Sequence, residues 1–342
     1  MDANKEYFVL LDANVWVAER LLQSSIGSAV LYALAESKAF IGLPEVVELE
    51  VNDVLRALAE KAVTNIANAS SLLRHLSGQR LHYTAPTVAA ISDGIAERWR
   101  LLDGVLQRIP FSHDHARSAL NRVISKVSPS GENNEQFRDC CIWEAALQLA
   151  RERTVYLVSN DYAFYDGRTR TNGLAPALRA EVERSGAQVV LCPNLRDFLS
   201  RAEQTVAALD ERAIETAIVA AVSTRAGELL KEQGGDHFEL GELIRTRIDG
   251  YATPRPSLVA VSFSVTFGLT HIEAKGSREE REKVTMTVSG LCSYEPRTHE
   301  VSDIEVREWD QRATGTGGSW GSFSYDPDSL DRRFSPSRIR VI

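Results

Sequence analysis

The chain has 342 residues, a length that suits two compact domains better than one. With 44% hydrophobic and 25% charged residues it can form a sizeable core, which excludes a wholly disordered chain. The net charge of -8 at pH 7 is spread over both parts of the chain, so charge alone does not indicate a general polyanion-binding protein.

Cellular location and thiol chemistry follow from what the sequence lacks. No apolar run is long enough to span a membrane, and the N-terminus lacks the basic flank and cleavage site of a signal peptide. The four cysteines, which form no C-x-x-C pair and have no histidine cluster beside them, are Cys140, Cys141, Cys192 and Cys292. We therefore expect a cytoplasmic protein with reduced, buried thiols and no zinc site.

In chain order, the first part alternates between apolar runs and helical patterns. Continuous apolar runs predict strands at residues 7–11, 39–43, 154–159 and 188–191, of the kind that is buried in a parallel sheet. Helical spacing predicts helices at residues 24–37, 46–68, 137–153 and 174–185, and residues 70–128 are expected to be mainly helical with a break near 81–86. Residues 128–134 (SPSGENN) predict a loop. This alternation predicts a three-layer α/β domain over residues 1–200 with a mainly parallel sheet.

The second part, residues 201–342, has a different character. A helix is predicted at residues 207–232, and extended strands are predicted at residues 258–270, 283–288 and 299–309. Residues 314–322 (TGTGGSWGS) are rich in glycine and serine and predict a loop. We expect a separate α+β domain with antiparallel strands, half exposed to solvent, and it contains no motif with recognisable chemistry.

Four carboxylates in residues 1–200 lie just after predicted strands or near the start of predicted helices. Asp12 directly follows the first strand, and Asp161 follows the strand at residues 154–159. Glu50 lies in the helix after the second strand, and Asp139 lies in the first turn of the helix that leads into the third. Because ligands gather beyond the carboxyl ends of parallel strands, we expect these four side chains to converge at one edge of the sheet.

Converging carboxylates require a cation. Two unit charges about 4 Å apart repel by roughly 4 kcal/mol at an effective dielectric constant near 20. Ligand sets made of oxygen alone, with no His or Cys, favour Mg²⁺ or Mn²⁺ over zinc. Such ions activate water and stabilise the oxygens of a phosphodiester undergoing hydrolysis. The residues thus indicate metal-dependent cleavage of a phosphodiester.

Four short segments resemble the motifs of one family, in the same order. Residues 10–16 (LLDANVW) have a strand followed by D-x-N, and residues 43–50 (LPEVVELE) have a proline, apolar residues and then a glutamate. Residues 137–143 (FRDCCIW) place an arginine before the aspartate and an aromatic residue after it. Residues 159–164 (SNDYAF) fit Ser/Thr-x-Asp-x-x-Phe. Together these motifs resemble a PIN-like domain, of the larger group that carries a helical insertion.

The resemblance implies a metal-dependent endoribonuclease that acts on nucleic acid, RNA rather than DNA. Asp12, Glu50, Asp139 and Asp161 would bind one or two Mg²⁺ or Mn²⁺ ions. Residues expected to contact the substrate or support the metal ligands are Asn14, Ser159, Asn160, Arg138 and Asp166. The long stretch between Glu50 and Asp139 implies a helical insertion. The C-terminal domain would recognise substrate, restrain the nuclease or mediate self-association, so a homodimer or a regulatory protein partner is expected.

Other interpretations remain open for individual residues. Asp12 also suits the N-cap of a helix, and Glu45 and Glu48 compete with Glu50. His113 and His115 do not share a helix face, so the segment between residues 113 and 115 is interpreted as solvated or capping rather than metal-binding. Residues that would contact phosphates, or alternatively belong to an ordinary charged surface, are Arg138, Arg168 and Arg170. Trp16 and Trp143 are expected in the core.

Two rival functions come from other classes. A haloacid-dehalogenase-like phosphatase also begins with a strand that ends in aspartate, but it needs a second aspartate where this chain has Asn14. A PIN-like fold that has lost its activity would serve as an RNA-binding or assembly scaffold. That alternative is disfavoured because a scaffold has no need to retain four mutually repelling carboxylates.

Overall fold

The computed structural model describes residues 6–78, 83–132, 135–202, 210–232, 238–271, 284–313 and 319–324. The chain forms two compact units, one comprising Met1–Leu21 and Leu34–Phe198, the other Leu22–Ala33 and Leu199–Ile342. These units differ from the predicted domains 1–200 and 201–342 mainly in the segment Leu22–Ala33. Whether either predicted domain folds alone stays a prediction.

The first unit is built on a five-stranded parallel sheet with the order β3-β2-β1-β4-β5. The strands are β1 (Tyr7–Leu11), β2 (Phe40–Pro44), β3 (Leu106–Ile109), β4 (Thr154–Val158) and β5 (Val189–Cys192). Every residue of the central strand β1 is buried, as its continuous apolar run requires. The predicted α/β architecture with a mainly parallel sheet is therefore confirmed.

Helices flank the sheet and connect its strands. They are α1 (Ala13–Ala18), α3 (Glu45–Ser77), α4 (Val88–Leu102), α5 (His113–Ser125), α6 (Phe137–Leu149) and α7 (Pro176–Ser185). Helices α2 (Ser25–Ser37) and α8 (Leu195–Arg201) each cross the boundary between the two units. Short 3₁₀ turns, η1 (Asp103–Val105), η2 (Tyr162–Phe164), η3 (Asp166–Arg168) and η4 (Arg170–Asn172), complete the unit. Helix α6 packs against both β2 and β4 and so brings its first turn to the carboxyl edge of the sheet.

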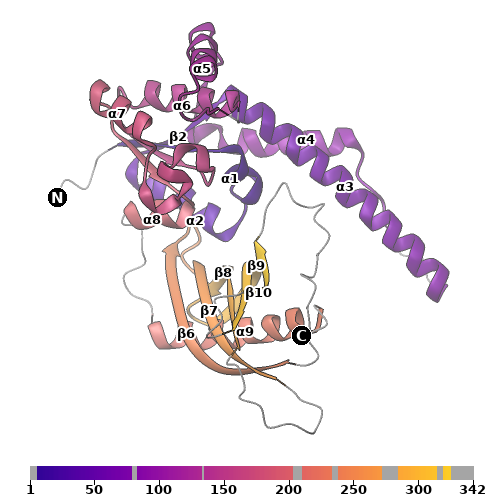
Figure 1. Cartoon of the computed structure of the whole chain (residues 1–342). Coiled ribbons are helices and arrows are strands. Elements are labelled where there is room, and N and C mark those ends of the chain that lie inside the picture. Colours follow the sequence, from indigo (N-terminus) through magenta and orange to yellow (C-terminus); the bar gives the residue numbers. More distant parts are fainter. Residues whose placement is uncertain are drawn as a thin grey trace. The chain divides into compact units, whose positions relative to one another are not determined.

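The predicted helical insertion is present. Helix α3 has 33 residues, which corresponds to about 50 Å, and α4 packs alongside it as the pair extends away from the sheet (Figure 1). The expectation that residues 70–128 are mainly helical was wrong at Leu106–Ile109, which form strand β3 at the edge of the sheet. The loop expected at residues 128–134 is non-helical as far as it is described; Asn133 and Asn134 lie outside the described residues.

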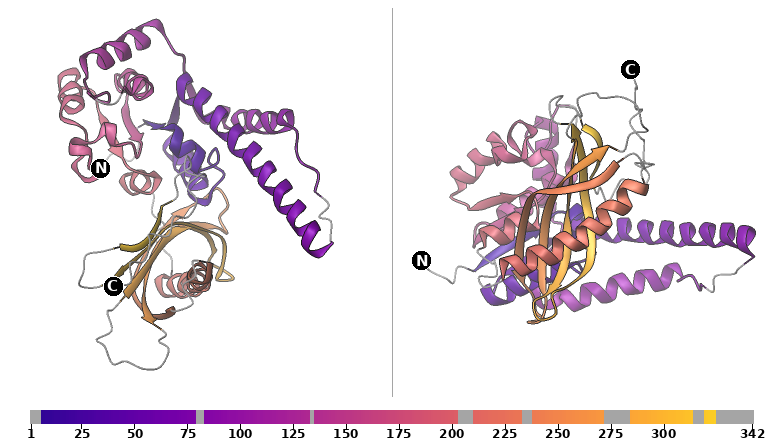
Figure 2. Two further views of the ribbon diagram at one scale, coloured as in Figure 1. Left: turned by 45° about the vertical axis from the view of Figure 1, so that its right-hand side comes forward. Right: turned by 90° about the horizontal axis from the view of Figure 1, so that it is seen from below.

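The second unit contains an antiparallel sheet with the order β10-β9-β8-β7-β6 and one long helix. Its elements are α9 (Glu211–Glu232), β6 (Phe238–Ala252), β7 (Val259–His271), β8 (Val284–Glu295), β9 (Glu300–Ala313) and β10 (Ser319–Ser324). Figure 2 shows the sheet curving around α9. The predicted antiparallel α+β architecture is confirmed. The loop predicted at residues 314–322 was wrong for residues 319–322, which lie in β10, and residues 314–318 lie outside the described residues.

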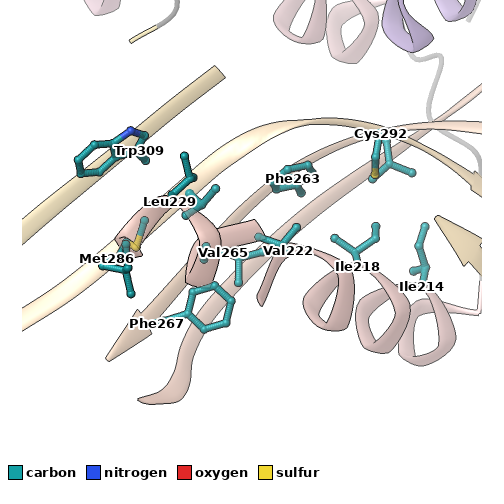
Figure 3. Close-up of a cluster of buried hydrophobic side chains, with 14 of the residues drawn as sticks. Ile214, Ile218, Val222, Leu229, Phe263, Val265, Phe267, Met286, Cys292 and Trp309 are labelled. Carbon is teal, nitrogen blue, oxygen red and sulfur yellow. The ribbon is translucent and has the colours of Figure 1, made fainter. Parts of the chain in front are cut away.

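The core of the second unit explains its alternating strands. One stripe of α9, which includes Ile214, Ile218 and Val222, packs against the concave face of the sheet (Figure 3). On β7 the residues that meet this stripe include Phe263 and Val265, because alternate residues of a strand share a face. The opposite face carries hydroxyl pairs, among them Ser289 with Ser264 at 2.9 Å and Thr266 with Thr287 at 3.0 Å. Among the described residues, no helix has both the length and the apolar composition of a membrane span.

Two glycines of the second unit give a paired test of this packing. A Cβ atom at Gly290 in β8 would lie 2.1 Å from the carbonyl oxygen of Glu305 and 2.9 Å from Phe263 Cζ. Gly290→Ala should therefore destabilise the unit by about 1–3 kcal/mol or more. A Cβ atom at Gly227 in α9 would meet no atom, so Gly227→Ala should stabilise the unit by about 0.5–1 kcal/mol. Urea unfolding measures both, and a Gly290→Ala protein as stable as wild type would contradict the packing.

Candidate functional site

Asp12 lies where β1 ends and α1 begins. Its backbone N–H donates to the carbonyl oxygen of Val158 at 3.0 Å, which extends the pairing of β1 with β4 by one residue. Its carboxylate accepts from the Ala13 N–H at 2.7 Å and from the Ser159 hydroxyl at 2.5 Å. The residue is only 6% exposed. Asp12 is thus the N-cap of α1, as one interpretation of the sequence held, and also a buried carboxylate at the sheet edge.

The surroundings of Asp12 resist its ionisation. Burial raises the pKa of its carboxyl to about 6, and the hydrogen bonds from Ser159 and Ala13 act in the opposite direction by stabilising the charged form. The carboxylates of Asp161 and Glu50 raise the pKa further. Asp12 is therefore within electrostatic range of two other acidic residues identified from the sequence.

Asp161 and Ser159 are held together after β4. The Ser159 hydroxyl, fully buried, accepts from the Asp161 N–H at 3.1 Å while it donates to Asp12. The Asp161 carboxylate accepts from the Ala163 N–H at 2.8 Å and caps the 3₁₀ turn η2. Gln136, just before α6, places its amide nitrogen 3.4 Å from both Asp161 oxygens. Ser159 therefore links the two aspartates that follow neighbouring strands.

Asp139 occupies the first turn of α6 as predicted. Burial raises the pKa of its carboxyl to about 8, and the charges of Asp12, Asp161 and Glu50 each raise the pKa as well. The guanidinium of Arg138 partly offsets this effect. The charges of Glu50 and Asp161 thus act on both Asp12 and Asp139, although the four residues come from four separate segments.

The three glutamates at the start of α3 have different partners. Glu50 forms an ion pair with Arg138. Glu48 instead pairs with Arg108 on β3 at 3.2 Å, and Glu45 accepts from the Phe111 N–H at 2.7 Å. Of the three, Glu50 is the one that raises the pKa of both Asp12 and Asp139. This arrangement favours Glu50 over its two rivals as the fourth acidic residue of the site.

The four carboxylates are too far apart, as they stand, to coordinate one metal ion together. Within the described ranges, no three His, Cys, Asp or Glu side chains are gathered closely enough to bind one metal ion. Charges affect one another's pKa over longer distances than those between a metal ion and its ligands. The pKa shifts and the absence of a close ligand group among the described residues therefore both describe a loose acidic cluster. The donor set consists of carboxylate oxygens whose ionisation is opposed by burial and mutual repulsion, which suits a hard divalent cation. In chemical type, then, the residues fit the Mg²⁺ or Mn²⁺ expected from the sequence.

The other candidates take different positions. The Asn14 amide donates to the side-chain oxygen of Asn160, which joins the residues beyond β1 and β4. Asp166 lies 3.8 Å from Arg179 and is not among the groups that most strongly shift the pKa of Asp12 or Asp139.

The predicted arginine, histidine and tryptophan residues also differ in their surroundings. Arg138 is 65% exposed beside Glu50, and the side chain of Arg168 lies outside the described residues. The segment containing His113 begins α5, where Ser112 is the N-cap, so capping describes it better than metal binding. Trp16 and Trp143 are fully buried, as expected of core residues.

The cysteines are also buried. Among the described residues, Cys140, Cys141, Cys192 and Cys292 form no disulfide. Burial raises the pKa of Cys141 to about 12, which keeps this thiol protonated and unreactive.

Two residues of the site were not identified from the sequence. One is Gln136, described above. The other is Tyr165, whose hydroxyl donates to the carbonyl oxygen of Ser159 at 2.7 Å and fixes the turn that carries Asp161. Gln136 could have been suspected because it directly precedes the helix of Asp139. Tyr165 had no such signal, since its contact depends on how the chain turns after β4.

The comparison with known families bears on this cluster directly. A family model described as PIN domain matches residues 9–164. That range begins in β1 and ends in the 3₁₀ turn after Asp161, so it contains all four acidic residues. No curated protein and no solved structure matches the chain.

The raised pKa values predict how pH affects the metal-free protein. A carboxyl whose pKa rises from 3.8 to about 8 on folding binds its proton more tightly in the folded state. The free energy of unfolding should therefore fall as pH rises from about 4 to about 8. Asp139→Asn should reduce this slope and stabilise the protein at neutral pH. Denaturant unfolding in a chelator, repeated across that range, provides the measurement; an unchanged slope in the variant would contradict the coupling.

Proposed function

We propose that this protein is a Mg²⁺- or Mn²⁺-dependent endoribonuclease, because a PIN domain family model matches residues 9–164 and PIN domains are generally nucleases. The observation that carries the proposal is the electrostatic coupling of four carboxylates from four segments at one sheet edge. Hydrolysis of phosphodiesters by such ions uses oxygen ligands of this type. The choice of RNA over DNA as the substrate rests on the family resemblance.

Each carboxylate has a role in this proposal. Asp12, Glu50, Asp139 and Asp161 would bind the metal. A bound divalent ion would supply an activated water and stabilise the charge that develops on the phosphate. Ser159 positions two of these ligands, because its hydroxyl donates to Asp12 and accepts from the Asp161 N–H.

The residues around the carboxylates have supporting roles. Arg138 balances the charge of Glu50 and is exposed enough to contact a phosphate. Asn14 and Asn160 hold the strand ends together and border the substrate. Asp166 has an outer position, toward Arg179, where it would act only through neighbouring residues.

The biological setting belongs to the same proposal. RNA decay and a toxin-like defence function are both consistent with a nuclease that carries an additional domain. The second unit would recognise the substrate, restrain the nuclease, or bind a regulatory protein or a second copy of the chain. Buried cysteines that form no disulfide among the described residues support a reducing compartment such as the cytoplasm.

A scaffold without activity is the second candidate function. The observation that favours it is that no three potential metal ligands among the described residues are gathered around a common point. Against it, burial and mutual repulsion of these carboxylates oppose folding, and the capping roles of Asp12 and Asp161 do not require Glu50 and Asp139 beside them. Measurements of RNA cleavage and of metal binding distinguish the nuclease from the inactive scaffold.

Loss of one metal ligand should abolish most of the activity. We expect Asp139→Asn and Glu50→Gln to lower the rate of Mn²⁺-dependent RNA cleavage by about two to three orders of magnitude, similar to removal of a preorganised transition-state contact. Glu48→Gln is the matched control, because Glu48 lies on the same helix but pairs with Arg108. It should cleave near the wild-type rate. End-mapped products from a labelled RNA give the measurement, and equal rates for Asp139→Asn and wild type would refute the assignment.

Metal binding can be measured without a substrate. Mn²⁺ should raise the melting temperature of the wild-type protein, because a ligand that binds only the folded state stabilises it. The same addition should raise the melting temperature of Asp139→Asn much less, whereas Glu48→Gln should respond as wild type does. If the protein is an inactive scaffold, adding Mn²⁺ should change the melting temperature equally little in all three proteins.

A further inference from the structure

Three exposed aromatic residues lie at the carboxyl edge of the parallel sheet. Tyr162 is 48% exposed, Phe111 is 41% exposed and Phe137 is 36% exposed. Each adjoins a residue of the acidic cluster or a strand end: Tyr162 follows Asp161, Phe137 lies two residues before Asp139, and Phe111 lies two residues beyond β3. Large rings left open beside a polar site are candidates for binding a planar ligand.

Tyr162 belongs to an ordered pair. The guanidinium of Arg170 lies 4.6 Å from the centre of the Tyr162 ring, within the range of a cation–π contact. The Arg170 Nε–H also donates to the carbonyl oxygen of Asn160 at 3.1 Å, and Asn160 in turn accepts from Asn14. A continuous set of contacts thus fixes this exposed pair to the strand end that carries Asp161.

Phe111 and Phe137 form the second pair. Their ring centres are 6.4 Å apart and their planes are inclined by 78°, an edge-to-face arrangement. The backbone of Phe111 is fixed by its hydrogen bond to Glu45, and Phe137 is the first residue of α6. Both rings therefore stand on anchored backbone although they face solvent.

The order of the strands places these pairs on opposite flanks of Asp12. In the sequence β3-β2-β1-β4, Phe111 follows β3, Asp12 follows β1, and Tyr162 comes after β4. With neighbouring strands about 4.8 Å apart, the flanking strand ends are separated by roughly 14 Å. An extended polymer lying across this edge would meet one aromatic pair on each side of the carboxylates.

We propose that the Tyr162–Arg170 and Phe111–Phe137 pairs are stacking platforms for unpaired bases on either side of the cleaved phosphodiester. The proposal rests on the proposed nuclease function and names the side chains that would hold the bases of a single-stranded substrate. Every base has a flat π-face that stacks on an aromatic ring without regard to sequence. In a duplex those faces are covered by neighbouring bases, so platforms of this kind select unpaired segments.

The test measures binding separately from cleavage. Full-length protein carrying Asp139→Asn, which should cut slowly, is titrated with a short fluorescein-labelled single-stranded RNA of mixed sequence in the presence of Mn²⁺. Tyr162→Ala or Phe137→Ala should each weaken binding by about 5- to 150-fold, the range expected for one base–aromatic stack. Tyr162→Phe and Phe137→Tyr should restore it, because a ring remains. An adenine analogue that loses fluorescence on stacking reports the contact directly.

Phe40 provides the matched control. It is 38% exposed, close to the exposure of Phe111, but it begins β2 at the opposite edge of the sheet. Phe40→Ala should bind RNA as the parent protein does. The same RNA annealed to its complement should bind more weakly than the single strand, and Tyr162→Ala should change duplex binding little.

The outcomes distinguish this proposal from the proposed function. Wild-type protein that cleaves RNA, with Tyr162→Ala and Phe137→Ala variants that bind as tightly as the parent, overturns the platforms and leaves the nuclease intact. Protein that never cleaves, but whose binding falls in both alanine variants and not in Phe40→Ala, overturns the nuclease and supports the platforms. A preference for duplex over single strand overturns the platforms.

Discussion

The pairing of β1 with β4 is the constraint on which the site depends. Leu11 is aligned with Val158, and the next hydrogen bond, from the Asp12 N–H to the Val158 carbonyl, fixes Asp12 beside the end of β4. The Ser159 hydroxyl then joins Asp12 to the turn that carries Asp161. A shift of this register would separate the two aspartates and change which residues face each layer of helices. The proposed site therefore rests on the backbone ladder between β1 and β4.

That ladder also sustains an arrangement that opposes folding. Burial and neighbouring carboxylates raise the pKa of Asp139 to about 8 and that of Asp12 to about 6. Groups of this kind persist only where the surrounding structure determines their positions, and local departures from the rules of stable folding occur mainly at functional sites. Here the fully buried strand β1 and the helix α6, packed against β2 and β4, supply that support. Arg138 offsets part of the repulsion through Glu50.

The sequence predicted the buried strands, which have a local apolar pattern, and missed exposed strands at the edges of the two sheets. Buried strands such as β1 have continuous apolar runs, so the residues that follow them, Asp12 among them, could be identified directly. Strand β3 has one buried residue in four, and β6, at the edge of its sheet, has one buried residue in fifteen, so neither shows the apolar pattern of a strand. The Phe111–Phe137 contact joins two elements through tertiary packing, which no spacing in the sequence reveals.

The charge of the protein gives those aromatic rings their importance. A chain with a net charge of -8, and with four carboxylates at the site, gains little from the release of counterions that drives most nucleic-acid binding. Affinity for a polyanion must then come from bound cations at the site and from contacts that do not depend on charge. Base stacking is such a contact, and it acts on the part of the nucleotide that carries no charge. If the proposed function and platforms hold, this acidic protein holds RNA by its bases, while its carboxylates and a bound metal engage the phosphate.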